Sequence, residues 1–289
     1  MTATPDVFLL CTAGSLSNRL NRLLARHPLI YPVPDLGLAH GVSISEWLAP
    51  SPGRTHHGLL RTVARLFSGE ETLESVEMAR RWLRRRGDRP AWEVRVELVR
   101  RVAPGVLVER MMVDSRSAAQ LAELGQIFPG AKFIHLIRHP LASGVAMMQT
   151  RESVTALWQQ RALLPAKRSP GLDPQVVWHA AHAVIGEFLE TQASENVIRI
   201  RAEDFGADPD AVLAAVCEWL GLSPADAGRE SVWPYEFPGP YNAMGGVDWE
   251  PVGEAFAVSP SLEESLPWAE GHYGLREEVK ELARSFGYE

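Results

Sequence analysis

The stretch VDSRSAAQLAELGQIFPGAKFIHLIRHPLASGVAMM, residues 113–148, decides the fold of this 289-residue chain. Residues 133–137 are apolar except for His135 and partly β-branched, which is typical of a strand covered on both faces of a parallel sheet. Arg138 follows at the carboxyl end of that strand, and Pro140 can open the next helix. Ligands of open α/β sheets bind at this edge, where arginine and helix-terminal N–H groups favour anions. The stretch therefore predicts a phosphate site.

Strand and helix patterns alternate on both sides of this stretch. The predicted strands cover residues 6–11, 106–108, 132–137 and 197–200. The predicted helices cover residues 19–26, 117–127, 174–191 and 208–220. Residues 12–18 form a turn of small and hydroxyl side chains between the first strand and helix, an arrangement that cradles phosphate. Repeated βα units predict an α/β fold, with a parallel sheet flanked by helices.

The length of the chain favours a single domain over residues 1–289, because it is long for one core and short for two. Residues 51–102 carry no strand pattern and are predicted to form a helical insertion. Residues 224–267 are rich in proline, glycine and tryptophan, and we expect an irregular region that packs over the site as a lid.

Composition excludes several classes of protein. A net charge of −7 argues against a nucleic-acid surface, which would need a concentrated basic face. The two cysteines, Cys11 and Cys217, are too few for a disulfide framework and fit a reducing compartment. The N-terminus has no basic region before its short apolar run, so we expect a cytoplasmic protein without a membrane span. The histidines do not form a metal-ligand pattern, and we expect no metal.

Residues 138–140, R-H-P, match the motif R-[DH]-P of the sulfotransferase family, and residues 113–117 match its upstream V-D-S motif. The chain resembles this family, whose members use 3′-phosphoadenosine 5′-phosphosulfate (PAPS). The resemblance implies a P-loop-like fold in which Arg138 and Arg116 hold the 3′-phosphate. The family usually has a serine eight residues after the arginine. This chain has Ala146 there, and Ser143 is the candidate replacement.

The turn after the first strand corresponds to the family's [RK]-S-G-T-T-x-L, which binds the 5′-phosphosulfate. Residues 14–20 read GSLSNRL, so the usual cation is absent and Leu16 replaces the glycine. Arg19 offers a positive charge one helical turn later. The resemblance implies that the donor is bound here by Thr12, Gly14, Ser15, Ser17 and Asn18.

A hydroxyl acceptor needs a general base that removes its proton. Several family members place a carboxylate shortly after an H-P pair, and here His27 and Pro28 precede Asp35 and His40. Alignment favours Asp35, although an aspartate in a proline-bounded loop is ordinarily a turn residue. His40 is the second candidate, because a neutral imidazole accepts a proton near pH 7. Asp35 is therefore either the general base or a turn residue.

The resemblance implies a sulfotransferase that acts on a hydroxyl of a small, largely apolar metabolite, in the manner of bacterial members from natural-product pathways. The alternative is a protein with the same fold that has lost or replaced this chemistry, because two cations of the family pattern are missing. One is absent from the first turn and the other from the loop GPYNAMGGVDW, residues 239–249. A P-loop kinase is less well supported, because the chain lacks G-x-x-x-x-G-K-[ST]. The sequence predicts no oligomeric state.

Overall fold

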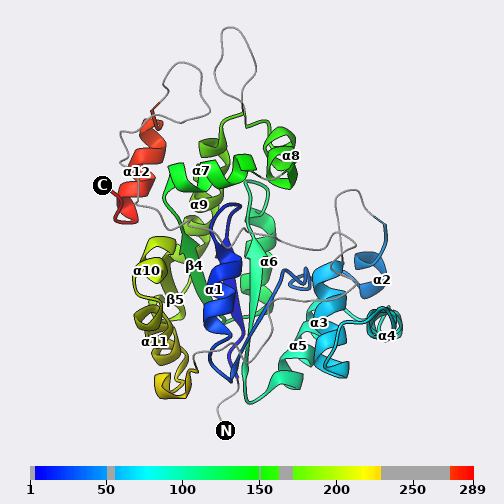
Figure 1. Cartoon of the computed structure of the whole chain (residues 1–289). Coiled ribbons are helices and arrows are strands. Elements are labelled where there is room, and N and C mark those ends of the chain that lie inside the picture. The colour runs from blue at the N-terminus through cyan, green and yellow to red at the C-terminus, as the bar shows by residue number, and fades with distance from the viewer. Residues whose placement is uncertain (1–3, 51–55, 150, 163–171, 229–273) are drawn as a thin grey trace.

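A five-stranded parallel sheet forms the centre of the molecule (Figure 1). The computed structural model describes residues 4–50, 56–149, 151–162, 172–228 and 274–289. The strands follow the order β2-β3-β1-β4-β5. Their bounds are β1 Val7–Cys11, β2 Ile30–Val33, β3 Val106–Met112, β4 Lys132–Ile137 and β5 Val197–Arg201. The chain runs from β1 to the edge strand β2, returns to β3 beside β1, and then crosses β1 to β4 and β5. The connections thus leave in opposite directions around β1, which makes the carboxyl ends of β1, β3 and β4 a topological switch point, the usual ligand position in such sheets.

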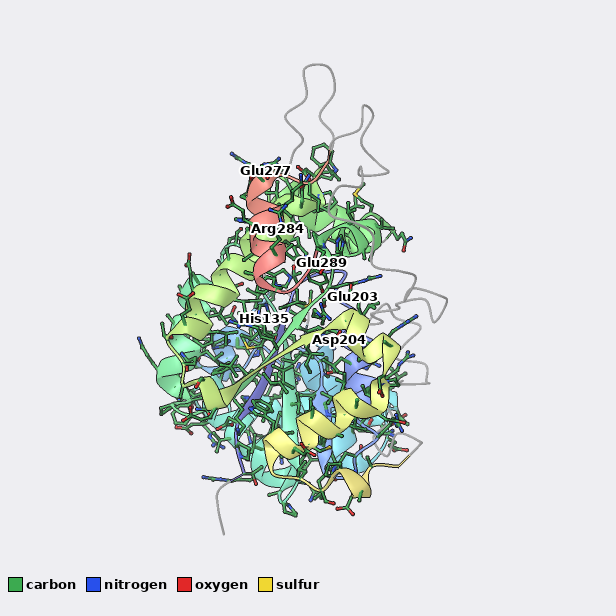
Figure 2. All side chains as sticks on the ribbon, turned by 90° about the vertical axis from the view of Figure 1, so that its left-hand side faces the viewer. His135, Glu203, Asp204, Glu277, Arg284 and Glu289 are labelled. Atoms are coloured by element: carbon green, nitrogen blue, oxygen red, sulfur yellow. The ribbon has the colours of Figure 1, made fainter. Side chains whose placement is uncertain are left out.

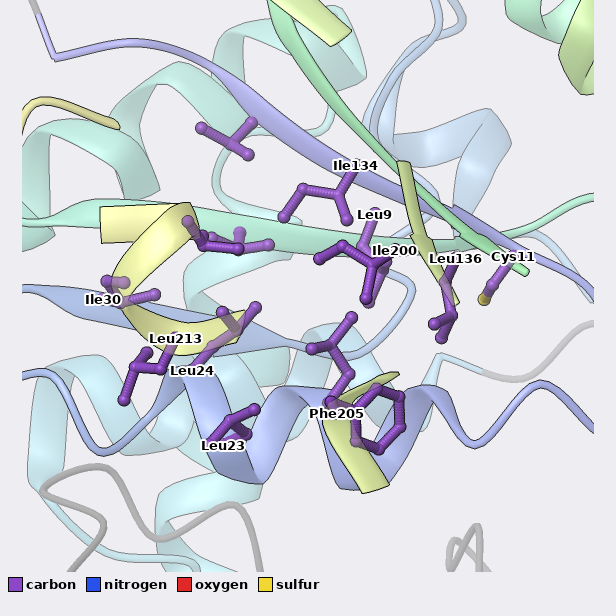
Figure 3. Close-up of a cluster of buried hydrophobic side chains, with 14 of the residues drawn as sticks. Leu9, Cys11, Leu23, Leu24, Ile30, Ile134, Leu136, Ile200, Phe205 and Leu213 are labelled. Atoms are coloured by element: carbon purple, nitrogen blue, oxygen red, sulfur yellow. The ribbon is translucent and has the colours of Figure 1, made fainter. Parts of the chain in front are cut away.

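One face of the sheet is covered by α1 (Ser17–Leu24), α10 (Ala202–Ala207) and α11 (Pro209–Leu220). Figure 3 shows the cluster between them, in which Leu9 and Ile134 of the sheet meet Leu24 and Phe205 of the helices. The other face is covered by α6 (Ala118–Ile127) and α9 (Pro174–Glu190). Strand β1 is buried along its whole length, because helices cover both of its faces.

Three further helices lie at the carboxyl end of β4: α7 (Pro140–Gln149), α8 (Arg151–Gln159) and α12 (Glu277–Ser285). Their apolar side chains form one cluster with Ile137, the last residue of β4, and with Trp178 of α9. Figure 1 shows α12, in red, beside α7 and α9 although it lies far from them in sequence. The end of the chain therefore packs near the predicted phosphate site.

A separate group of helices packs at the β2 edge of the sheet: α2 (Ile44–Trp47), α3 (His57–Ser68), α4 (Leu73–Arg84) and α5 (Ala91–Val102). Residues 56–102 contain no strand. Most of the predicted lid, from residue 229 onward, lies outside the described residues, and residues 224–226 form the short helix η2. Another short helix, η1 (Ser194–Asn196), precedes β5. None of the helices in the described ranges is long and apolar enough to cross a membrane.

The predicted α/β fold with a parallel sheet is confirmed, and several elements differ from the prediction. Strand β2 was not predicted, because Pro32 interrupts its pattern; an edge strand tolerates proline since one side of it needs no ladder bond. Strand β3 runs to Met112 rather than ending at Val108. Helix α1 begins at Ser17, two residues before the predicted start at Arg19.

Candidate functional site

Arg138 lies at the carboxyl end of β4 and contacts the turn that follows β1. Its side chain is buried, and Nη1 donates a hydrogen bond of 2.9 Å to the carbonyl oxygen of Gly14. Gly14 has a φ of 73°, and a Cβ atom there would lie 2.5 Å from the carbonyl oxygen of Ser143. Three predicted site residues, from β4, α7 and the first turn, therefore meet at one place.

The peptide group between Arg138 and His139 is held from both sides. Trp178 Nε1 donates to the Arg138 carbonyl at 2.9 Å, and the His139 N–H donates to Glu203 Oε1 at 3.0 Å. Ser143 Oγ also approaches the Arg138 carbonyl, at 3.4 Å. Helices α9 and α10 thus fix the backbone from which the Arg138 side chain projects.

The hydroxyl and amide side chains of the first turn are buried: Thr12, Ser15, Ser17 and Asn18. Thr12 Oγ1 has no hydrogen-bond partner among the described residues, although its side chain is buried. Leu16, at the N-cap of α1, has a φ of 65° and provides no side-chain cap. The turn therefore combines the positive end of a helix with a buried hydroxyl that a ligand could satisfy.

Arg110 of β3 places a buried positive charge beside this turn. Its Nη1 donates to Asn18 Oδ1 at 2.5 Å. Burial raises the pKa of the Cys11 thiol to about 11, while Arg110 and the hydroxyls of Ser17 and Ser15 act to lower it. These effects on one thiol show that a cation and two hydroxyls surround the end of β1. The raised pKa keeps Cys11 a thiol and makes it a poor nucleophile.

Asp35 also lies near the end of β1, where its negative charge acts to raise the pKa of the Cys11 thiol. Asp35 Oδ1 accepts a bond of 2.9 Å from the Gly37 N–H, and Oδ2 accepts one of 3.4 Å from the Met112 N–H. The residue is therefore a turn aspartate that is also tied to the carboxyl end of β3. The His40 ring meets Trp47 of α2 edge-on, at 5.5 Å between centroids.

The other two predicted cations are less closely tied to the site. The side chain of Arg116 is 71% exposed, and its Nη2 pairs with Asp114 Oδ2 at 2.5 Å. Arg19 lies half-buried on α1, and its backbone N–H bonds to Leu16. The two glycines of the predicted C-terminal loop, Gly245 and Gly246, lie outside the described residues.

Buried histidines lie below the C-terminal helix rather than in a metal site. His135 Nε2 and His182 Nδ1 are 2.9 Å apart, and the ring of Phe286 contacts both. Within the described ranges, no group of three or more histidine, cysteine or carboxylate side chains is arranged to hold a metal ion.

Sequence reasoning missed Arg110, Glu203 and Tyr288. Two adjacent charges inside an apolar run, Glu109 and Arg110, were the available signal for the first. Glu203 lies in the segment RAEDF, residues 201–205, which resembles the R-Y-E-D-L segment of the sulfotransferase family, a structural marker of that fold. Tyr288 donates to Glu203 Oε2 at 2.8 Å, and no motif marks it.

The model of the sulfotransferase family matches residues 5–226. The structure is similar to the sulfotransferase domain of the olefin synthase from Synechococcus PCC 7002, with 20% identity, a TM-score of 0.70, and coverage of 99% of this chain and 95% of that one. It is also similar to the sulfotransferase domain from the curacin biosynthetic pathway, with 19% identity, a TM-score of 0.75, and coverage of 99% and 98%. A search of curated protein sequences gives no match.

The family match includes the first turn, Arg110 and the R-H-P motif, which are the parts that the fold brings to one edge of the sheet. The two structural similarities support the same P-loop-like sulfotransferase fold over almost the whole chain. The chain belongs to the sulfotransferase family.

Proposed function

We propose that this protein transfers a sulfuryl group from PAPS to a hydroxyl of a small, largely apolar metabolite. The observation that carries the proposal is the bond from Arg138 Nη1 to the Gly14 carbonyl, at 2.9 Å. This bond joins the two parts of the chain that resemble the family's 3′-phosphate and 5′-phosphosulfate motifs. One nucleotide can therefore contact both parts at once.

The described residues fit an anionic donor. A buried hydroxyl without a partner, Thr12 Oγ1, and a glycine that passes close to Ser143 are features of a backbone cradle for phosphate. Arg138 and Ser143 would hold the 3′-phosphate, with Arg116 reaching it from the surface. The 5′-phosphosulfate would be held by the turn, through Thr12, Gly14, Ser15, Ser17 and Asn18.

Arg110 supplies the cation that the first turn lacks. It is buried and bonded to Asn18, so its charge acts at short range in a region of low dielectric. PAPS, when bound, supplies the sulfuryl group, and negative charge then develops on the leaving phosphate. Arg110, with Arg19 on the next helical turn, would stabilise that charge.

Asp35 is the better candidate for the general base. Its position beside Met112 and near Cys11 supports it over His40, which packs against Trp47 of α2. Its carboxylate would take the proton of the acceptor hydroxyl as the new S–O bond forms. Met112, 40% exposed, offers an apolar surface beside this carboxylate, in agreement with an apolar acceptor.

The structural neighbours support an acceptor from a natural-product pathway, since they are domains of an olefin synthase and of curacin biosynthesis. The test is an acceptor screen with PAPS and apolar alcohols, with products identified by mass spectrometry. We expect transfer by the wild type and by His40→Gln, and a rate at least about 100-fold lower for Asp35→Asn. Full activity of Asp35→Asn would contradict the assigned base. Failure of the folded wild type to bind the donor would favour a repurposed fold.

A further inference from the structure

The end of the chain reaches the candidate site through one carboxylate. Glu203 uses its two oxygens for different partners: Oε1 accepts the His139 N–H at 3.0 Å, and Oε2 accepts the Tyr288 hydroxyl at 2.8 Å. The Tyr288 ring also meets the His139 ring edge-on, at 5.2 Å between centroids. The residue next to Arg138 is therefore held by a side chain near the C-terminus.

Helix α12, which carries Tyr288 to this position, is anchored at both ends. At its start, Arg276 Nη2 bonds to the buried Asp173 Oδ2 at 2.7 Å, and the Arg276 N–H bonds to Gln175 Oε1 at 2.8 Å. After its end, the Gly287 carbonyl accepts Arg201 Nη1 at 3.0 Å. Figure 2 shows α12, with Glu277 and Arg284, above Glu203 and Asp204 of α10.

The chemical state of these groups suits a permanent contact. Burial and the neighbouring Glu203 raise the pKa of Tyr288, so its hydroxyl stays a donor at neutral pH. Burial, with Arg138 beside it, lowers the pKa of His139 to about 4, so its neutral Nδ1 can accept the Leu141 N–H. Both rings thus keep their hydrogen bonds across the physiological pH range.

We propose that Tyr288 and Glu203 are positioning residues that aim Arg138 at the 3′-phosphate of the bound nucleotide. Trp178 already holds the carbonyl side of the Arg138–His139 peptide group, and Glu203 holds its N–H side. Loss of the Tyr288 bond leaves Glu203 free to turn, and the peptide group then loses its fixed orientation. The proposal rests on the proposed function. Tyr288 lies in residues 274–289 of the chain, beyond the part that the family model matches.

The test compares Tyr288→Phe, which removes only the hydroxyl, with Glu289→Gln, which changes the exposed neighbouring residue. Calorimetry measures the affinity for 3′-phosphoadenosine 5′-phosphate (PAP), and competition measures the affinity for adenosine 5′-phosphate, which lacks the 3′-phosphate. One lost hydrogen bond should make Tyr288→Phe bind PAP about fivefold more weakly, with adenosine 5′-phosphate affected less than about twofold. Glu289→Gln should match the wild type.

Equal affinities of Tyr288→Phe and the wild type for PAP would overturn the proposal. An equal loss of affinity for PAP and for adenosine 5′-phosphate would also overturn the proposal. Such a result would indicate a general structural defect, which weakens binding whether or not the nucleotide has a 3′-phosphate. Hydrogen exchange of the amides of residues 138–143 provides a readout that needs no nucleotide. If the folded wild type binds no PAP, the proposed function fails. Faster exchange in Tyr288→Phe than in Glu289→Gln still supports the positioning role, and equal exchange refutes it.

Discussion

Arg110 places a buried positive charge beside a turn whose own sequence contains no cation. The first turn has no lysine or arginine between Thr12 and Asn18, yet Arg110 of β3 bonds to Asn18 from the neighbouring strand. The two residues are 92 positions apart, so only the parallel pairing of β1 and β3 brings them together. A positive charge thus lies next to the turn although no residue of the turn carries one.

Replacing Arg110 tests this role at the residue scale. Arg110→Met should weaken PAP binding about tenfold or more, because a charge-assisted contact to phosphate contributes about 1.5–3 kcal/mol. Arg110→Lys should recover part of the affinity. Arg85→Met, a change of an exposed arginine at the end of α4, serves as the matched control in calorimetry. Unchanged affinity of a folded Arg110→Met protein would exclude Arg110 from the nucleotide site.

The buried histidines predict how stability depends on pH. Burial lowers the pKa of His139 to about 4 and that of His182 to about 3, in each case with help from a neighbouring positive or titratable side chain. In the unfolded chain both titrate near about 6.5. Below that pH the unfolded chain binds protons that the folded protein does not, so the free energy of unfolding should decrease from about pH 6.5 to about pH 4.

Urea denaturation across this range checks the prediction. The double variant His135→Leu, His182→Leu should lose less stability between pH 6.5 and pH 4 than the wild type, because the buried pair no longer titrates on unfolding. Both proteins have the same carboxylates, which contribute equally to the change of the free energy of unfolding with pH. The difference between the two slopes therefore reports the histidine pair alone. Parallel slopes would show that the pair does not contribute to the pH dependence.

At the scale of single elements, the sequence correctly predicted the strands and helices whose ends are marked by neighbouring residues. Strand β4 has the predicted bounds, because an apolar run ends abruptly at Arg138. Helix α11 follows Asp208, whose side chain caps it, and ends at Gly221 in the left-handed conformation. Strand β3 was predicted too short, because Glu109 and Arg110 break its apolar pattern. Their partners, such as Arg95 at 2.7 Å from Glu109, come from other elements and leave no local signal.

Helix α12 provides the test at this scale. Arg276→Met removes the partner of the buried Asp173 carboxylate and should lower the free energy of unfolding by about 1–3 kcal/mol. Arg284→Met, an exposed change on the same helix, should have little effect. Urea denaturation of the two variants and the wild type measures the difference. Equal stability of all three would show that the Arg276–Asp173 pair does not anchor the helix.

At the scale of the whole molecule, parallel topology explains how far the site could be predicted. The order β2-β3-β1-β4-β5 brings the ends of β1, β3 and β4 to one edge, so a turn after β1 and an arginine after β4 can be expected to meet. The family resemblance assigned Gly14, Arg138 and Ser143 to one nucleotide, and the structure places these three residues together. It could not predict the contact of Tyr288 with Glu203, because that contact depends on how α12 docks against β5 and α10.

The most direct test of the account is calorimetric titration of PAP into the wild-type protein and the variant Arg138→Ala. Arg284→Ala, which changes an exposed arginine, serves as the control. We predict micromolar affinity for the wild type and for Arg284→Ala, and a loss of at least about tenfold for Arg138→Ala, as expected for a buried charge-assisted phosphate contact. A folded wild type that binds no PAP, or an Arg138→Ala protein that binds it equally well, would contradict the proposed nucleotide site.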